Sequence, residues 1–379
     1  MNKKHVWGIV VVLVIIGAFV MNARKPQDLS AEPIKIGSIS ALTGVGAAIG
    51  EAERRGAQLA IDEINANGGV LGRPLQLISE DVSIDKIKNG ATVTQKLINI
   101  DKVIAIVGPQ WDEPAEPILP LIEAAKIPMV GPDTSDQLEK DTNYDYFFST
   151  WYDNRVGIRE LLRHAQKENI ENFTVIRLVD AGFWKFTADT FVNEAPNYGV
   201  NIVDDINLGN PLVQDFRTVI TKVKSQKPEA VFVVTSDYNQ CTLLKQMDDL
   251  ALNVLSFGTE SSGDSVSLVN CPQSLERRVF STPVKTKGQI EFEEKFEKKY
   301  GSKPEYPSIV TAYDAVRMIA DALRRSKLEG GEALQKAIAE TNMPGAAVPV
   351  IKFNEKGFLQ TPEDAFEMKT MKGGVFVEI

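Results

Sequence analysis

The sequence predicts an α/β protein in which parallel sheets form two domains. The chain has 379 residues, 43% of them hydrophobic, which is more than one ordinary hydrophobic core accommodates. After residue 33, short apolar segments alternate with amphipathic helical segments. This alternation is typical of parallel sheets connected by right-handed crossovers. Charged residues make up 25% of the chain, a value typical of globular rather than disordered proteins.

Residues 1–33 are predicted to contain an export signal or a membrane anchor, followed by a short linker. Two lysines precede an apolar run over residues 6–21, and a basic start before such a run is typical of export. Cleavage and retention both stay open, because Met21 and Ala23 stand where two small residues usually precede a cleavage site. The first 240 residues contain no cysteine, which excludes a lipid anchor on that side chain. We therefore expect an extracytoplasmic protein, in the periplasm or at the cell surface, that is secreted or membrane-anchored.

Eight short apolar segments are predicted to be strands, and helical stretches separate most of them. They are Ile34–Ser40, Leu75–Asp81, Val103–Val107, Pro128–Val130, Thr174–Val179, Val200–Asn207, Ala230–Val234 and Val254–Gly258. Between the first two strands, apolar side chains recur at helical spacing and would form one buried stripe: Ala57, Ala60, Ile61 and Ile64. Asn67-Gly68-Gly69 should end this helix, since glycine adopts the left-handed conformation at a helix end without penalty.

The last fifteen residues show a different pattern. Ala365–Met371 and Val375–Ile379 flank Lys372-Gly373-Gly374 and are predicted to form a hairpin. The chain contains no repeat of 20–50 residues and no low-complexity linker. Short crossings must therefore join the two domains, and a few residues at such crossings can absorb a domain rotation.

The loops that follow the predicted strands are the candidate ligand-binding segments, because ligands of open parallel sheets bind beyond the carboxyl ends of the strands. These loops are rich in Gly, Asp, Ser, Thr and Trp, and together they are expected to form two facing edges. They are residues 41–50, 108–114, 131–136, 180–184, 235–239 and 258–262.

Signals for an enzyme, a cofactor or a nucleic-acid partner are weak. The net charge of −9 argues against nucleic acid, which would require a basic face. His164 is the only histidine after the export segment, and no G-x-S-x-G motif or metal-binding spacing of His or Cys occurs. The loop Gly44–Gly50 resembles a dinucleotide fingerprint, but its third glycine comes one position late. We expect neither catalysis nor a cofactor.

Cys241 and Cys271 are the only cysteines of the chain. Outside the cytoplasm a disulfide between them is allowed, and two separate buried thiols are the alternative.

An ordered set of motifs between residues 34 and 379 resembles the leucine/isoleucine/valine-binding proteins, the type I periplasmic binding proteins that serve ABC transporters. The motifs are Ile34–Gly37, Ala41–Gly44, Gly56–Asn65, Gly68-Gly69, Ile106–Gly108, Ile127–Pro132, Phe216, Val254–Gly258 and Thr311–Ala315. The resemblance implies two doubly wound parallel-sheet lobes, joined by three hinge crossings, with the ligand between them.

The resemblance also implies the limits of the two lobes. Lobe I would comprise residues 34–150 and 284–343, and lobe II residues 151–283 and 344–379. The crossings would lie near residues 149–153, 281–283 and 342–345.

Six ligand-binding positions follow from the resemblance: Asp112, Asp133, Ser135, Trp184, Ser236 and Glu260. Glu260 matches the acid that receives the ligand ammonium, and Ser135 matches a hydroxyl that contacts the ligand carboxylate. Asp133 would contribute its backbone, and Trp184 an aromatic wall. Two positions depart from the family pattern, because Ser236 replaces an aromatic residue and Asp112 replaces the serine or threonine that binds the carboxylate. A carboxylate at residue 112 would repel that of the ligand.

The resemblance therefore predicts the solute-binding protein of an ABC importer, which captures a small polar, amine-bearing ligand by lobe closure and then docks on a membrane permease. Asp112, Asp133 and Glu260 together suit a cationic or polyhydroxylated ligand. The alternative is a membrane-tethered receptor domain of the same fold that senses its ligand.

Overall fold

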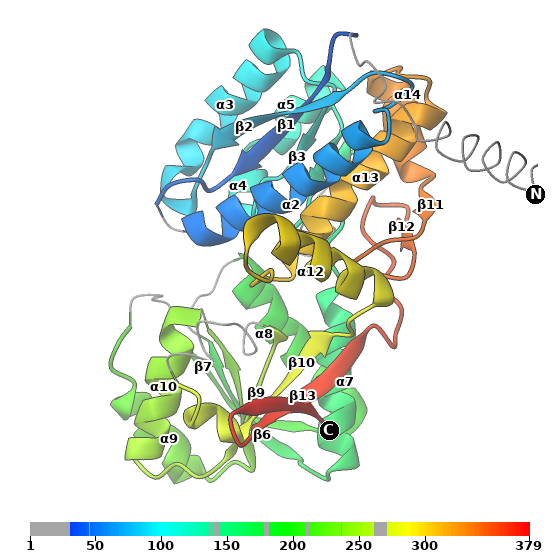
Figure 1. Ribbon diagram of the computed structural model, residues 1–379. Helices are drawn as coiled ribbons and strands as arrows, with labels where there is room; N and C mark the ends of the chain where they lie inside the picture. Colours follow the sequence, from blue (N-terminus) through cyan, green and yellow to red (C-terminus); the bar gives the residue numbers. More distant parts are fainter. Residues whose placement is uncertain are drawn as a thin grey trace, which may run out of the picture.

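The computed structural model describes residues 31–44, 46–135, 138, 144–177, 182–208, 213–235, 237–260 and 271–379. The chain forms two lobes, each built on a sheet of its own (Figure 1). This architecture confirms the predicted α/β class with doubly wound parallel-sheet lobes.

The sheet of lobe I has five parallel strands in the order β2-β1-β3-β4-β5. Nearly every residue of its interior strand β1 is buried, as expected of a parallel strand that is covered on both faces. The strands are β1 (Ile34–Ser40), β2 (Leu75–Asp81), β3 (Ala105–Val107), β4 (Met129–Gly131) and β5 (Phe147–Ser149).

Two hydrophobic clusters cover the two faces of this sheet. In β3, Ala105 and Val107 belong to the cluster with α2 and α13, whereas Ile106 belongs to the cluster with α5. The helices and short helical turns are α2 (Ala47–Ala66), η1 (Ile84–Asn89), α3 (Gly90–Lys96), η2 (Leu97–Asp101), α4 (Asp112–Ala115), α5 (Leu119–Ala125), α13 (Ser308–Arg325) and α14 (Gly331–Ala339).

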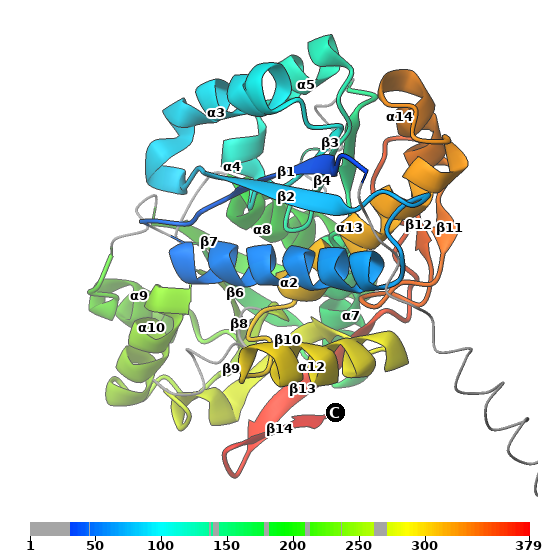
Figure 2. The same cartoon turned by 45° about the horizontal axis from the view of Figure 1, so that its top comes forward.

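Helices α2 and α13 lie side by side along lobe I (Figure 2). Their closest approach requires a glycine, because a β-carbon on Gly56 would lie 2.3 Å from the carbonyl oxygen of Ile309. Helix α2 ends at Ala66, and Gly68 and Gly69 follow with φ of 93° and 70°, which confirms the predicted helix end.

The sheet of lobe II has seven strands in the order β14-β13-β10-β9-β8-β6-β7. Strands β6 to β10 are parallel, whereas β13 runs antiparallel to β10 and pairs with β14 as the predicted hairpin. The strands are β6 (Asn172–Arg177), β7 (Asn201–Asn207), β8 (Ala230–Val234), β9 (Leu255–Gly258), β10 (Arg278–Pro283), β13 (Phe366–Lys372) and β14 (Val375–Glu378).

Helices flank this second sheet, as Figure 1 shows. They are α7 (Asn154–Lys167), α8 (Gly182–Glu194), η3 (Ala195–Tyr198), α9 (Arg217–Gln226), α10 (Asp237–Asp249) and η5 (Ser274–Arg277). A disulfide joins Cys241 of α10 to Cys271, with the two Cα atoms 5.4 Å apart. Of the two alternatives for these cysteines, the structure therefore shows the bond.

The last crossing between the lobes comes later in the chain than the predicted residues 342–345. Helix α12 (Lys287–Tyr300) and the short strands β11 (Asn342–Met343) and β12 (Ile351–Lys352) precede it. Ile351 and Phe353 are buried in the same cluster as β1, and the chain enters the second sheet only at β13. The predicted boundary at 343/344 is therefore too early, because the apolar residues after it complete the core of lobe I.

This late segment runs beside the first crossing. The N–H of Ser149 donates to the carbonyl of Gly357 at 3.0 Å, and the N–H of Leu359 donates to the carbonyl of Ser149 at 3.2 Å. A third bond joins the N–H of Asp153 to the hydroxyl of Thr361 at 2.7 Å. Two crossings are thus hydrogen-bonded to each other.

Candidate ligand-binding site

The two lobes touch at α4 of lobe I and α8 of lobe II. The contact is close, because a β-carbon on Gly182 would lie 2.4 Å from Oε1 of Glu113. Gly182 also has φ of +54°, a conformation that favours glycine. The Glu113 carboxylate of one lobe therefore lies at the N-terminus of a helix of the other, where the helix dipole favours negative charge.

Asp112 and Ser135 are brought together within lobe I. The Asp112 side chain is 2% exposed, and its Oδ1 accepts a hydrogen bond from the N–H of Ser135 at 2.7 Å. Its Oδ2 accepts a second bond from the Ser135 hydroxyl. Burial raises the pKa of Asp112 to about 7, although the two hydrogen bonds act in the opposite direction. The carboxyl at this position is thus engaged by the protein itself.

Trp111 positions Asp133 beside this pair. The N–H of Trp111 donates to the carbonyl of Asp133 at 2.9 Å, and the Trp111 side chain acts to lower the pKa of the Asp133 carboxyl. Burial nevertheless raises the pKa of Asp133 to about 7. Trp111 itself has φ of +71°, an uncommon value for a non-glycine residue. The Trp111 backbone thus ties the segment before α4 to the segment after β4.

Asp133 of lobe I acts electrostatically on Glu260 of lobe II. Glu260 follows β9 in lobe II, and burial raises its pKa to about 7. The negative charge of Asp133 raises that pKa further. Two residues predicted from different lobes are therefore close enough to repel each other when both are ionised.

Two predicted positions remain, Trp184 and Ser236. Trp184 lies on α8, partly buried against the core of lobe II, with its ring 5.1 Å from that of Phe183 in an edge-to-face contact. Ser236 lies outside the described residues. His164 lies in the last turn of α7, where burial lowers its pKa.

Two buried polar residues at this site were not predicted. Glu53 of α2 is 2% exposed, and neither of its carboxylate oxygens has a hydrogen-bond partner among the described residues. Gln110 is 1% exposed, and its amide nitrogen and oxygen are likewise unpartnered there. The sequence does indicate that Glu53 is buried. It stands four residues before Ala57 and so lies on the same buried face of α2.

The site offers acceptors rather than metal ligands. Among the residues that the structure describes, no group of three or more His, Cys, Asp or Glu side chains could hold a metal ion. Carboxyl groups and the Gln110 amide can accept hydrogen bonds from an ammonium group.

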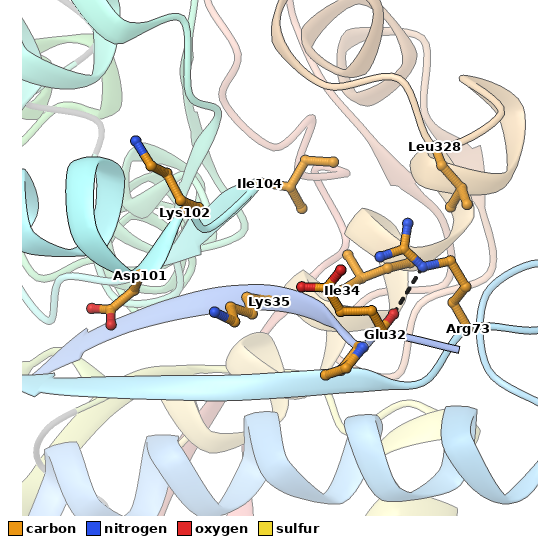
Figure 3. A pocket seen from close by; sticks show the side chains of 9 residues that line it. Glu32, Ile34, Lys35, Arg73, Asp101, Lys102, Ile104 and Leu328 are labelled. Carbon is orange, nitrogen blue, oxygen red and sulfur yellow. Dashed lines mark hydrogen bonds between the residues drawn. The ribbon is translucent and has the colours of Figure 1, made fainter. Parts of the chain in front are cut away.

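A pocket of about 170 Å³ lies elsewhere in lobe I (Figure 3). Its lining includes Ile34, the first residue of β1, and Arg73, whose Nε donates to the carbonyl of Glu32 at 2.9 Å. This pocket is at the amino end of the strand, opposite to the edge where parallel sheets bind ligands. It is therefore separate from the candidate site.

Comparisons with known proteins identify similar chains and a matching family. Residues 33–374 match the model of a family described as periplasmic binding protein. The Leu/Ile/Val-binding protein BraC3 of Rhizobium johnstonii is 28% identical over 255 residues, which cover 63% of each chain. The leucine-, isoleucine-, valine-, threonine- and alanine-binding protein of Pseudomonas aeruginosa is 26% identical over 349 residues, covering 88% of this chain and 89% of the relative.

Among solved structures, the substrate-binding protein LivJ of Streptococcus pneumoniae, crystallised with isoleucine, superposes with a TM-score of 0.79. It is 22% identical, and the match covers 92% of this chain and all of LivJ. Within the residues described here, no helix combines the length and apolar character needed to cross a membrane.

Proposed function

Because this chain belongs to the periplasmic binding protein family, a family of solute-binding proteins rather than enzymes, we propose that it is the solute-binding component of an ABC importer. We propose further that it captures a small polar, amine-bearing solute between its two lobes. The partner is an ABC permease in the membrane. The protein works outside the cytoplasm, and residues 1–33 serve its export or anchoring.

The electrostatic effect of Asp133 in lobe I on Glu260 in lobe II carries this proposal. In the absence of ligand, closing the lobes brings two carboxyls together, and the negative charge of Asp133 raises the pKa of Glu260. An ammonium group between them replaces this repulsion with charge-assisted hydrogen bonds. Because such a ligand contacts both lobes only when they meet, its binding favours the closed arrangement.

The hydrogen bonds from Ser135 to Asp112 affect which class of solute the site can bind. Ser135 was expected to contact a ligand carboxylate, but both its N–H and its hydroxyl donate to Asp112. The relatives are named for leucine, isoleucine and valine, which all carry a carboxylate. We therefore propose an amine-bearing solute and do not restrict it to branched-chain amino acids.

The test is a binding assay on the protein with a panel of amines, amino acids, amides and aromatic acids. A ligand that binds stabilises the folded state, so thermal shifts rank the panel and titration calorimetry gives Kd. We expect amine-bearing solutes to bind, and we expect Glu260→Gln to weaken their binding at least about ten-fold, as loss of a charged hydrogen-bond partner does.

Glu276→Gln is the matched control, because Glu276 lies on the surface of the same lobe. Binding of solutes that lack an amine, with unchanged affinity in Glu260→Gln, would contradict the proposal.

A further inference from the structure

We propose that the Ser149 hydroxyl is a positioning group, which couples residues 131–135 to the crossings between the lobes. Residues 131–135 include Asp133 and Ser135 and are called the binding loop below. The inference rests on the proposed function, because it states how capture of a solute is linked to rotation of the lobes. Ser149 is 0% exposed, so it acts through its neighbours and not by contact with the solute.

The Ser149 hydroxyl joins the binding loop to the first crossing. It donates a hydrogen bond to the carbonyl of Thr134 at 2.9 Å, and it accepts one from the Thr134 hydroxyl at 3.1 Å. It also accepts a hydrogen bond from the N–H of Trp151 at 3.2 Å. One donated and two accepted bonds are the full capacity of a hydroxyl group. The whole capacity of this side chain is therefore used to hold the two segments together.

These hydrogen bonds lie in the protein interior. Thr134 is 1% exposed, so water cannot replace a partner that it loses, and an unmet buried polar group is costly. Thr134 is also tightly packed, since a β-carbon on Gly131 would lie 2.3 Å from its Oγ1. We therefore expect Thr134 to follow a movement of Ser149 rather than to separate from it.

A movement of Thr134 reaches the candidate site through its two neighbours in the chain. On one side, the carbonyl of Asp133 accepts a hydrogen bond from the N–H of Trp111 at 2.9 Å. On the other side, the N–H of Ser135 donates to Oδ1 of Asp112 at 2.7 Å. A shift of Thr134 thus acts on both predicted ligand positions of the binding loop.

Ser149 is also attached to the crossings. Its N–H donates to the carbonyl of Gly357, and its carbonyl accepts from the N–H of Leu359 in the last crossing. The indole of Trp151 donates to Oδ1 of Asn154 at 3.3 Å, and Asn154 is the first residue of α7 in lobe II. Rotation of lobe II therefore reaches the binding loop through a continuous set of hydrogen bonds.

The backbone alone connects these segments over a shorter distance. The N–H of Thr150 donates to the carbonyl of Gly131 at 3.0 Å, which continues the pairing of β4 with β5. This bond reaches only the first residue of the binding loop. Among the residues that the structure describes, Ser149 is the one whose hydrogen bonds extend the connection to Thr134.

Native-state hydrogen exchange of the solute-free protein tests this coupling in two variants. Thr134→Val removes the hydroxyl that donates to Ser149 and keeps the shape of the side chain. Thr311→Val is the matched control, because the Thr311 hydroxyl holds the same loop through the carbonyl of Pro132 at 2.6 Å. The second bond of that hydroxyl goes to Ser308, so both of its bonds stay within lobe I. Thr134→Ser retains the hydroxyl and should exchange like the unaltered protein.

The N–H groups of Ser135 and Leu359 report on the binding loop and on the last crossing. In Thr134→Val we expect both to exchange about five- to ten-fold faster, the factor for loss of one hydrogen bond. In Thr311→Val we expect this change at Ser135 alone. Unchanged exchange at Leu359 in Thr134→Val, or equal acceleration there in Thr311→Val, would overturn the inference.

Exchange of the unaltered protein at increasing denaturant needs no variant and no solute. We expect the N–H groups of Ser135 and Leu359 to open with the same free energy and the same dependence on denaturant, because they belong to one cooperative unit. Openings that differ in both quantities would show that the two segments move independently, and the inference would fail.

Stopped-flow fluorescence with leucine and with 1-aminobutane tests the link to solute capture. We expect Thr134→Val to raise the dissociation rate constant about five- to ten-fold and to leave the association rate constant unchanged, because uncoupling makes the closed arrangement less favourable. Thr134→Ser should restore slow dissociation, and an equal rise in Thr311→Val would contradict the coupling. If neither probe binds the unaltered protein, these two solutes are excluded for the proposed function, while the exchange results still decide the inference.

Discussion

The Asp112 carboxylate and Ser135 form a closed pair in which Ser135 donates both its N–H, at 2.7 Å, and its hydroxyl. The pair ties the loop after β3 to the loop after β4. It therefore orders one side of the candidate site.

Asp112→Ala should destabilise the protein more than it weakens ligand binding. The variant leaves the buried Ser135 N–H without its acceptor, which costs about 2 kcal/mol. Denaturant unfolding measures this loss, and Asp112→Asn is the matched control, because its amide oxygen can still accept from the N–H. An increase of ten-fold or more in affinity for an amino acid, without loss of stability, would show instead that Asp112 faces the ligand carboxylate.

The ligand-free protein should become less stable as the pH rises from 5 to 8. The pKa values of Asp112, Asp133 and Glu260 are raised to about 7, so each carboxyl contributes stability that is present below its ordinary pKa and lost as the pH rises through about 7. One such shift corresponds to a change on the order of 3 kcal/mol. Calorimetric unfolding across this range measures the effect.

The difference in Tm between the unaltered protein and Glu260→Gln isolates this contribution. The comparison cancels the opposite effect of His164, whose lowered pKa makes its neutral form favourable and costs stability as the pH falls. We expect the slope of Tm against pH to be shallower in the variant. Equal slopes would mean that Glu260 titrates alike in the folded and unfolded chains.

Glu113→Gln should weaken ligand binding by favouring the open arrangement. The Glu113 carboxylate reaches the N-terminus of α8 only when the lobes meet, and such a contact contributes about 0.3–1 kcal/mol at low salt, or about two- to five-fold in Kd. Titration at low and at high ionic strength measures the effect, which should shrink in salt. Glu116→Gln, at the C-terminal end of the same helix, serves as the control, and an equal loss in both variants would exclude this role.

Reduction of the disulfide should destabilise lobe II. The bond closes a segment with a sequence separation of 30 residues, for which the chain-entropy relation gives about 4 kcal/mol. Denaturant unfolding of the protein and of a Cys241→Ser/Cys271→Ser variant, each with and without reductant, measures the loss. Reductant should affect only the unaltered protein, and an unchanged midpoint there would show that the bond adds no stability.

Most of the strands were predictable from the sequence for one physical reason. Parallel strands that are buried on both faces are continuous apolar runs, so segments such as Ala230–Val234 stand out from the helices around them. Strand β10 was not predicted from the sequence, because its first residue is Arg278. This arginine is buried and hydrogen-bonds Ser256 and Gln240. Such a polar start hides a strand that is otherwise well buried.

The site was less predictable because it depends on which loops meet in space. The order of motifs predicts Asp133 and Glu260 as ligand contacts, and this stays a prediction. The pairing of Asp112 with Ser135, which lie 23 residues apart, could not be predicted from that order. Glu53 was missed because a helical glutamate is usually exposed, and only its place on the stripe of Ala57 indicates burial. The predicted role of Trp184 as an aromatic wall stays a prediction.

The hydrogen bonds that Ser149 makes with Gly357 and Leu359 join two of the crossings into a small ribbon. Two strands joined in this way cannot slide past each other without breaking those bonds, but they can bend together. We therefore expect the lobes to rotate about a single hinge axis, so that one angle describes their relative motion. Under the proposed function, a permease that recognises this angle would distinguish the loaded protein from the empty one without contacting the solute.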